Sequence, residues 1–241
     1  MACVPFLLGM TTTPELEDLL VHFDRVAFGN EYTGERFPRV RKWKNPLRIG
    51  IQGDAPDFLD AEIRQHVGEL HRLTRHPIDL VYSAGMRRAG MVAPGFNTRD
   101  LNVIVYFVPR EKIEPSIRHY FDNDSSQVAR MMATATCFAK FFKKKDEIRA
   151  AIVVIPANLS REVIRACVVE ELTQIMGLPN DSDHIDQSVF NDKSRFNELT
   201  RYDRMLVRLL YDERLASGTP RPEALALARI TLGRFLTQDL E

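Results

Sequence analysis

Polar side chains that could bind a metal ion or activate water lie close together in the segment CVVEELTQIMGLPND, which runs from Cys167 to Asp181. Glu170 and Gln174 are four residues apart, so a helix places them one turn apart on the same side. In helices that bind a catalytic zinc ion, imidazoles take two positions at this spacing and a glutamate beside the first is the general base. The segment has that glutamate, Glu171, but no histidine. These residues therefore predict a pocket more clearly than a reaction.

A glycine follows the polar pair and is expected to turn the chain. Gly177 is placed to end the helix in a left-handed conformation. The resulting turn would bring Asn180 and Asp181 back toward the helix. The metal-ligand positions would then be held by Glu170, Gln174 and Asn180, and oxygen ligands suit calcium, magnesium or manganese better than zinc. The donor set therefore leaves a hard divalent cation possible as a cofactor and predicts poor binding of zinc.

A structural role for the same residues is the open alternative. On a helical wheel, one face is apolar, and Glu170 and Gln174 share a second stripe with Cys167. The helix is therefore expected to be buried, with these two polar side chains pointing into the protein or a cleft. Buried polar groups need hydrogen-bond partners. Glu170, Gln174, Asn180 and Asp181 could supply one another with partners and brace the helix end without any metal.

Helices and strands elsewhere in the chain must position this segment. Apolar residues at helical spacing predict helices over 16–27, 58–74, 111–121, 200–211 and 222–236, besides the helix that Ser160 caps. Apolar runs predict strands over 47–52, 78–82, 101–108, 136–142 and 148–155, the last two forming a hairpin. The basic segment 29–45 is expected to be a solvated connection. His66 and His71, on the second helix, are expected to be solvated or interface residues.

The order of these elements resembles the metzincin branch of the zincin metalloproteases, in which a strand, a long helix and further strands precede the motif helix. The stretch Leu199-Thr200-Arg201-Tyr202-Asp203 also resembles the opening of the last helix in matrix-type metalloproteases. The resemblance implies an α+β fold with a mixed twisted sheet, an active-site-type helix and a smaller helical C-terminal subdomain. It implies an N-terminal segment and leading helix over 1–30 and one zincin-like domain over 31–241, divided into subdomains 31–178 and 179–241.

A bacterial family known only as a domain of unknown function is also similar to the chain. The similarity extends from Phe23 to Tyr211 and includes Phe23-Asp24, Trp43, Glu170-Glu171, Gln174, Gly177-Leu178, Asn180-Asp181-Ser182 and Phe190-Asn191-Asp192. Some members of that family are described as lipoproteins. The resemblance therefore implies a periplasmic or membrane-anchored location in the cell envelope, and it supplies no established activity.

Departures from active metzincins bear on the function. None of the six histidines occupies a ligand position of the motif, and only His184 is close enough to join an oxygen-rich site. The methionine turn of metzincins corresponds here to 188–191, which has no methionine. These departures favour a catalytically degenerate protein that binds a ligand, peptide or protein partner in the former cleft. The alternative is an active metallopeptidase or metallohydrolase with Glu171 as general base.

Composition and cysteines give weaker indications of partners and location. Thirty-three basic residues balance thirty-three acidic residues, so no overall field favours nucleic acid or a membrane surface, and no nucleic-acid partner is expected. Cys3 follows a small residue and is a candidate for lipidation, which would be the only membrane anchor; an ordinary buried or frayed cysteine is the alternative. Cys137 and Cys167 could form a disulfide in an oxidising compartment, or remain reduced in the core of a cytoplasmic protein.

Overall fold

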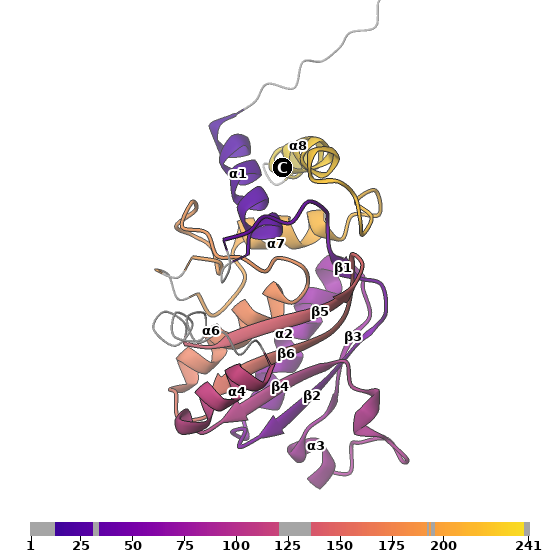
Figure 1. The fold of residues 1–241 in the computed structure, drawn as a ribbon, viewed down its shortest axis with the longest axis vertical. Coiled ribbons are helices and arrows are strands. Elements are labelled where there is room, and N and C mark those ends of the chain that lie inside the picture. Colours follow the sequence, from indigo (N-terminus) through magenta and orange to yellow (C-terminus); the bar gives the residue numbers. More distant parts are fainter. Residues whose placement is uncertain (1–12, 31–33, 121–135, 192, 194–195, 239–241) are drawn as a thin grey trace, which may run out of the picture.

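The computed structural model describes residues 13–30, 34–120, 136–191, 193 and 196–238 (Figure 1). Its helices are α1 (Pro14–Phe28), α2 (Leu59–Thr74), α3 (Ala84–Arg88), α4 (Ile113–Tyr120), α6 (Arg161–Gln174), α7 (Arg201–Leu210) and α8 (Arg221–Gln238). Its strands are β1 (Lys42–Trp43), β2 (Leu47–Gly53), β3 (Ile78–Tyr82), β4 (Val103–Val108), β5 (Phe138–Lys144) and β6 (Glu147–Pro156). The predicted helices and strands are confirmed, with ends that differ by a few residues. Cys3, the lipidation candidate, lies outside the described residues.

The sheet is mostly parallel and has one antiparallel strand. Strands β3, β2, β4 and β6 lie side by side in that order and run parallel, whereas β5 pairs antiparallel with β6. The short strand β1 pairs in parallel with the start of β6, with Trp43 opposite Ile148. Continuous apolar runs form β4 and much of β6 because both faces of these strands are covered. The predicted mixed sheet and α+β class are therefore confirmed.

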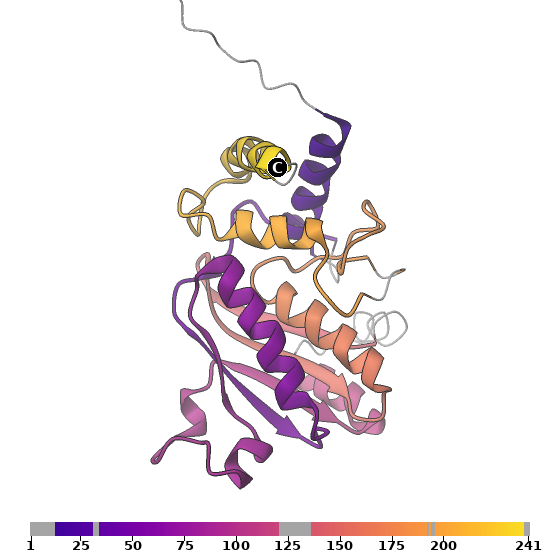
Figure 2. The same cartoon turned by 180° about the vertical axis from the view of Figure 1, so that it is seen from behind.

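Helices cover both faces of the sheet. Figure 2 shows α2 and α6 across one face, and Figure 1 shows α4 against the other. Alternate residues of β6 point to opposite faces. Val153 and Ile155 join the large core beneath α2 and α6, whereas Ile152 and Val154 pack with Ile113 of α4 in a smaller cluster. The arrangement places α6, which carries the polar motif, directly on the sheet.

Three helices from opposite ends of the chain gather beyond one end of the sheet (Figure 1). Glu17 of α1 forms an ion pair with Arg229 of α8. Asp24 of α1 accepts hydrogen bonds from Arg221 of α8 at 2.5 and 2.7 Å. The leading helix is thus held by the last helix, and α7 lies between them and the sheet. None of the helices that the structure describes is both long and apolar enough to cross a membrane.

The basic segment before β2 differs from the expected solvated connection. The Trp43 indole donates a hydrogen bond to the carbonyl oxygen of Ile175 at 2.7 Å, and the Lys42 ammonium donates to that of Leu210 at 3.1 Å. The last carbonyl groups of a helix have no partner within the helix. These side chains satisfy such groups at the C-terminal ends of α6 and α7. Arg41 is buried as well, with 2% of its surface exposed, so the prediction was wrong for this part of the segment.

Candidate functional site

Local sequence places the motif residues on a buried helix. The Ser160 hydroxyl accepts a hydrogen bond from the Val163 backbone N–H, which begins α6 at the expected position. Apolar residues surround much of α6, and burial extends to Glu171 at 4% exposure and Gln174 at 5%. Glu170, one residue earlier than Glu171, is partly exposed. The predicted burial of the helix is confirmed for Glu171 and Gln174, whereas Glu170 is less buried than expected.

Gly177 turns the chain after α6. Its φ angle is +121°, in the range that favours glycine, and its N–H donates to the carbonyl oxygen of Gln174 at 3.0 Å. A side chain at this position would overlap the backbone carbonyl oxygen of Arg41. The sharp turn and the close approach of the two backbones therefore both require glycine. The expected turn at a positive φ angle is confirmed for this glycine, although α6 itself ends three residues earlier, at Gln174.

The turn brings two of the predicted site residues together. The Gln174 amide nitrogen donates a hydrogen bond to Asp181 Oδ1 at 2.7 Å. The Asn180 side chain donates to the backbone carbonyl oxygen of Asp181 at 2.6 Å. A side chain at Gly29, just after α1, would overlap the Asn180 amide, so Asn180 packs against the end of α1. Internal hydrogen bonds thus join three of the polar positions, Gln174, Asn180 and Asp181.

The donor set does not fit a metal ion as it is arranged. Among the described residues, no three His, Cys, Asp or Glu side chains gather closely enough to hold one. Gln174 directs its amide N–H groups toward Asp181, and an N–H group cannot serve as a metal ligand. A cation at this position would have to replace that hydrogen bond with coordination through the amide oxygen.

His184, the one histidine close to the motif in sequence, contacts a different helix. Its Nε2 atom lies 3.2 Å from Asp18 Oδ1 of α1. The imidazole lines a hollow of about 500 Å³ together with Glu15, Asp18, Leu19, Ile185 and Tyr202. The structure therefore places His184 with the acidic residues of α1 and brings it into no contact with Gln174 among the described interactions.

The stretch that corresponds to the methionine turn belongs to a buried polar network. The Ser188 hydroxyl donates to Asp203 Oδ1 at 2.7 Å and lies 3.0 Å from His22 Nε2. The other imidazole nitrogen of His22 lies 3.3 Å from the Ser182 hydroxyl. Thr200 and Asp203 also form a reciprocal capping box at the start of α7. The network therefore connects α1 and α7 with the chain that follows α6.

Burial controls the ionisation of this network. Burial lowers the pKa of His22 to about 4, and the positive charge of Arg25 and the nearby His184 act in the same direction. Burial also raises the pKa of Asp203, although hydrogen bonds from Ser188 and Thr200 oppose that change. Because Ser188 and Asp203 are fully buried, the three side chains connect helices and have no access to a substrate. The sequence analysis missed this network, although a histidine on the apolar stripe of α1 and the Thr200–Asp203 spacing were signals for it.

Arg41 lies beside the turn after α6 and is the most deeply buried arginine described. Its Nη2 atom donates to the carbonyl oxygen of Ala27 at 2.8 Å, whereas Nε and Nη1 have no acceptor among the residues that the structure describes. The guanidinium carbon lies 3.2 Å from the centre of the Phe37 ring and 5.4 Å from that of Phe141. Burial lowers the pKa of Arg41 to about 9, and the Asp146 carboxylate opposes that change. No feature of the basic run distinguished this arginine from its neighbours.

A family assignment follows from the whole chain. The family model described as "Protein of unknown function (DUF2927)" matches residues 17–229. The chain belongs to this family. A search of the curated proteins finds no match to the chain. The DUF2927 match begins in α1 and ends in α8, so it includes the sheet, α6 and the chain that carries Asp181.

A disulfide ties α6 of this DUF2927 protein to the start of β5. The sulfur atoms of Cys137 and Cys167 are bonded, and the Cα atoms are 5.9 Å apart. Cys167 lies one turn before Glu170 on α6, and Cys137 immediately precedes β5. The disulfide thus fixes the motif helix to the antiparallel strand of the sheet.

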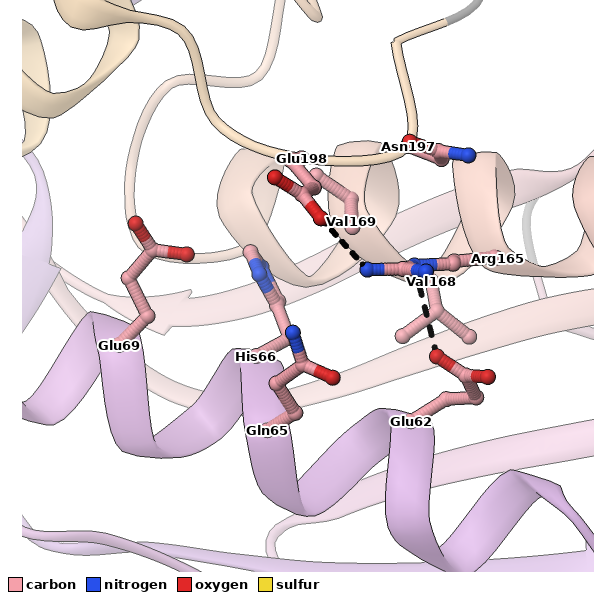
Figure 3. A pocket seen from close by; sticks show the side chains of 9 residues that line it. All are labelled: Glu62, Gln65, His66, Glu69, Arg165, Val168, Val169, Asn197 and Glu198. Carbon is pink, nitrogen blue, oxygen red and sulfur yellow. Dashed lines mark hydrogen bonds and ion pairs between the residues drawn. The ribbon is translucent and has the colours of Figure 1, made fainter.

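The opposite side of α6 forms a narrow charged groove with α2. Figure 3 shows Arg165 of α6 between Glu62 of α2 and Glu198, with ion-pair distances of 3.4 and 2.8 Å. His66 of α2 lies 3.1 Å from the Thr173 hydroxyl of α6, and burial lowers its pKa to about 3. The expectation that His66 is solvated or at an interface was wrong because α6 covers this face of α2. The groove encloses about 20 Å³, which is room for little more than a water molecule, so it braces the two helices.

Proposed function

We propose that this DUF2927 protein is a catalytically degenerate, metzincin-like protein of the cell envelope that binds a ligand or partner at the C-terminal end of α6. The observation that carries the proposal is the hydrogen bond from the Gln174 amide nitrogen to Asp181. Gln174 occupies a motif position at which an active enzyme needs a metal ligand. In this proposal the buried Gln174 holds the partly exposed Asp181 in place at a polar binding surface beside the end of α6.

The hydrogen bond stabilises the arrangement against metal binding. Gln174 is almost fully buried, so breaking its bond to Asp181 without a substitute would cost about 1–3 kcal/mol. A divalent cation would also need further ligands, and His184 faces Asp18 on α1. Glu171 therefore serves as a buried structural carboxylate in this proposal, without a metal-bound water to activate.

The order of elements supports the metzincin-like shape. Strand β2, the long helix α2, strands β3 and β4, the β5–β6 hairpin and α6 follow one another as in the resemblance on which the shape was predicted. We retain the division into a sheet-containing subdomain over 31–178 and a helical subdomain over 179–241. The contacts between α1 and α8 indicate that the leading helix belongs with the second of these.

The disulfide supports the proposed location. Disulfides persist in oxidising compartments such as the bacterial periplasm and are rare in the cytoplasm. The bond between Cys137 and Cys167 is therefore consistent with a periplasmic or membrane-anchored protein. Lipidation at Cys3 remains a proposal, and mass spectrometry of the N-terminal peptide from the native host tests it.

Metal content and hydrolysis test the function. The protein is purified without chelator, its divalent metals are measured, and peptide hydrolysis is compared among wild type, Glu171→Gln and Gln174→Ala. Glu162→Gln is the matched control because Glu162 is an exposed carboxylate on the same helix. We expect less than stoichiometric metal and no hydrolysis that depends on Glu171. Stoichiometric metal, with hydrolysis that Glu171→Gln abolishes and Glu162→Gln leaves intact, would establish the metallohydrolase instead.

A further inference from the structure

We propose that Arg41 is the anchor for a carboxylate group of the ligand, an inference that rests on the proposed binding function and names the ligand's chemistry. Arg41 lies where β1, the end of α1 and the turn after α6 meet. It is the only described side chain that buries a positive charge beside the proposed site while two of its nitrogen atoms lack an acceptor.

The Arg41 guanidinium has N–H groups without an acceptor among the described residues. A guanidinium carries five N–H groups, and buried donors without an acceptor are rare in folded proteins. The carbonyl oxygen of Ala27 accepts from Nη2, and no described protein atom accepts from Nε or Nη1. Among the described residues, no carboxylate forms an ion pair with Arg41 either. An anion that binds these nitrogen atoms would supply the missing acceptors and, in addition to the Asp146 carboxylate, a negative charge in direct contact with the guanidinium.

Aromatic rings beside the Arg41 guanidinium restrict the shape of an anion that can bind there. The Phe37 ring lies against the guanidinium, with 3.2 Å between the ring centre and the guanidinium carbon, and Phe141 of β5 is the next ring. An aromatic ring that covers a guanidinium face leaves the edge of the group for hydrogen bonding. A carboxylate is planar and can lie in the plane of the guanidinium, where its two oxygen atoms meet N–H groups. A bulkier tetrahedral anion fits less well beside the rings.

Arg41 lies beside the turn that carries the proposed site. Its backbone carbonyl oxygen contacts Gly177, the residue that turns the chain after α6. Its side chain donates a hydrogen bond to the carbonyl oxygen of Ala27. Gly29, two residues after Ala27, packs against the Asn180 amide. A carboxylate on Arg41 therefore lies next to the polar residues that end α6. One ligand can contact both.

Access to Arg41 involves Phe37. Arg41 is 2% exposed, and Phe37, whose ring lies against the guanidinium, is partly exposed. The Phe37 backbone N–H donates to the carbonyl oxygen of Phe28 at 2.7 Å, so its main chain is held in place. In this proposal, rotation of the Phe37 ring is the movement that admits the ligand.

Thermal unfolding with acetate as the probe tests the proposal. The melting temperature of the full chain is measured against sodium acetate at constant ionic strength, with sodium chloride as the balancing salt. Wild type is expected to gain about 4 °C at ten times the half-saturating concentration. Arg41→Met is expected to lose this gain. Arg165→Met, which removes an arginine near the N-terminal end of α6, is expected to keep it.

Two further measurements keep the test decisive if Arg41→Met folds poorly. Phe37→Ala leaves Arg41 in place and uncovers it, so the half-saturating acetate concentration should fall several-fold. In wild type, the NMR signal of the Arg41 Nε–H should shift on titration with acetate and much less with phosphate. The proposal is overturned if Arg41→Met keeps the acetate response, if Phe37→Ala leaves the half-saturating concentration unchanged, or if phosphate matches acetate. These outcomes are independent of metal content and hydrolysis, so each proposal can fail alone.

Discussion

Arg41 and Arg165 lie near opposite ends of α6 and have different surroundings. Arg165 is 27% exposed in its side chain and lies between the carboxylates of Glu62 and Glu198. Arg41 is almost fully buried and meets one carbonyl group and two aromatic rings. Both side chains carry a guanidinium, but among the described residues Arg165 forms ion pairs with two carboxylates, whereas Arg41 forms none and interacts only with the more distant Asp146 carboxylate. The difference separates an arginine that joins helices from one that, in the proposal above, binds a carboxylate of the ligand.

Burial explains why the two environments matter so differently. A partly exposed cation loses little hydration, and two nearby carboxylates offset that loss, so Arg165 contributes modestly to stability. A buried cation without a counter-ion loses hydration that the protein does not replace. Proteins retain such an unfavourable buried charge where the same group performs a function. The groove between α2 and α6 therefore braces the helix, and the proposed ligand site lies beside the turn at Gly177.

The largest expected effect comes from Gly177→Ala, which disrupts the Arg41 side of the comparison. The new side chain would overlap the Arg41 carbonyl oxygen in a backbone conformation that strains alanine. Together the strain and the steric overlap should lower the free energy of unfolding by about 4 kcal/mol. Urea denaturation measures this loss. Gly90→Ala is the control, because Gly90 has a φ angle of +68° in open space and should cost about 1 kcal/mol. Equal losses at the two glycines would contradict the close contact with Arg41.

A pH-dependent effect should come from His66 on the groove side. Its pKa is about 3 in the folded protein and about 6.5 when unfolded, so between these values only the unfolded state binds the proton. Stability is therefore complete above pH 6.5 and falls as the pH decreases toward 3. By pH 4.5 the loss from His66 should reach about 2.5 kcal/mol.

His66→Gln should remove this part of the pH dependence and keep a hydrogen-bonding partner for Thr173. Denaturant unfolding at pH 7 and 4.5 measures it in both proteins. His71→Gln is the matched control because His71 is exposed on the same helix, and His22 contributes equally to all three proteins. If His66→Gln loses as much stability on acidification as wild type, His66 is not buried in the neutral form.

The smallest expected effect is the coupling between Glu62 and Arg165. Their side chains are 3.4 Å apart, and Arg165 is partly solvated, so a double-mutant cycle with Glu62→Gln and Arg165→Met should give about 1 kcal/mol. The exposed pair Asp57 and Arg88 is the control and should show no measurable coupling. If the coupling energy is well above that of an ordinary surface pair, Arg165 does not behave as a partly solvated arginine, and its contrast with the buried Arg41 fails.

Most of the fold could be predicted from local patterns. Apolar spacing gave the helix over 58–74, and the continuous run over 101–108 indicated a strand covered on both faces; the structure confirms both. The hairpin that turns at Lys145 and Asp146 was predicted from two apolar strands flanking a basic turn. Such elements depend on residues that are close in the chain, so their periodicity is visible without a structure.

The candidate site could be predicted only in part. The spacing from Gln174 through Gly177 to Asp181 indicated that the turn would bring the two polar side chains together, and their hydrogen bond agrees with that interpretation. The sequence left open whether His184 would join them, and the structure places His184 beside Asp18 instead. That contact depends on how α1 packs against the chain after α6, which no local pattern encodes.

By itself, then, the sequence determined the elements, the buried motif helix and the glycine that turns the chain after it. The tertiary structure alone decided which polar side chains meet: it buried Arg41 within a run of basic residues and joined His22 to Ser188 across 166 positions. The physical reason is that burial and electrostatic environment are sums over neighbours from distant parts of the chain. A residue's type states which charge or hydrogen bond it can offer, and only the packed structure states which partner receives it.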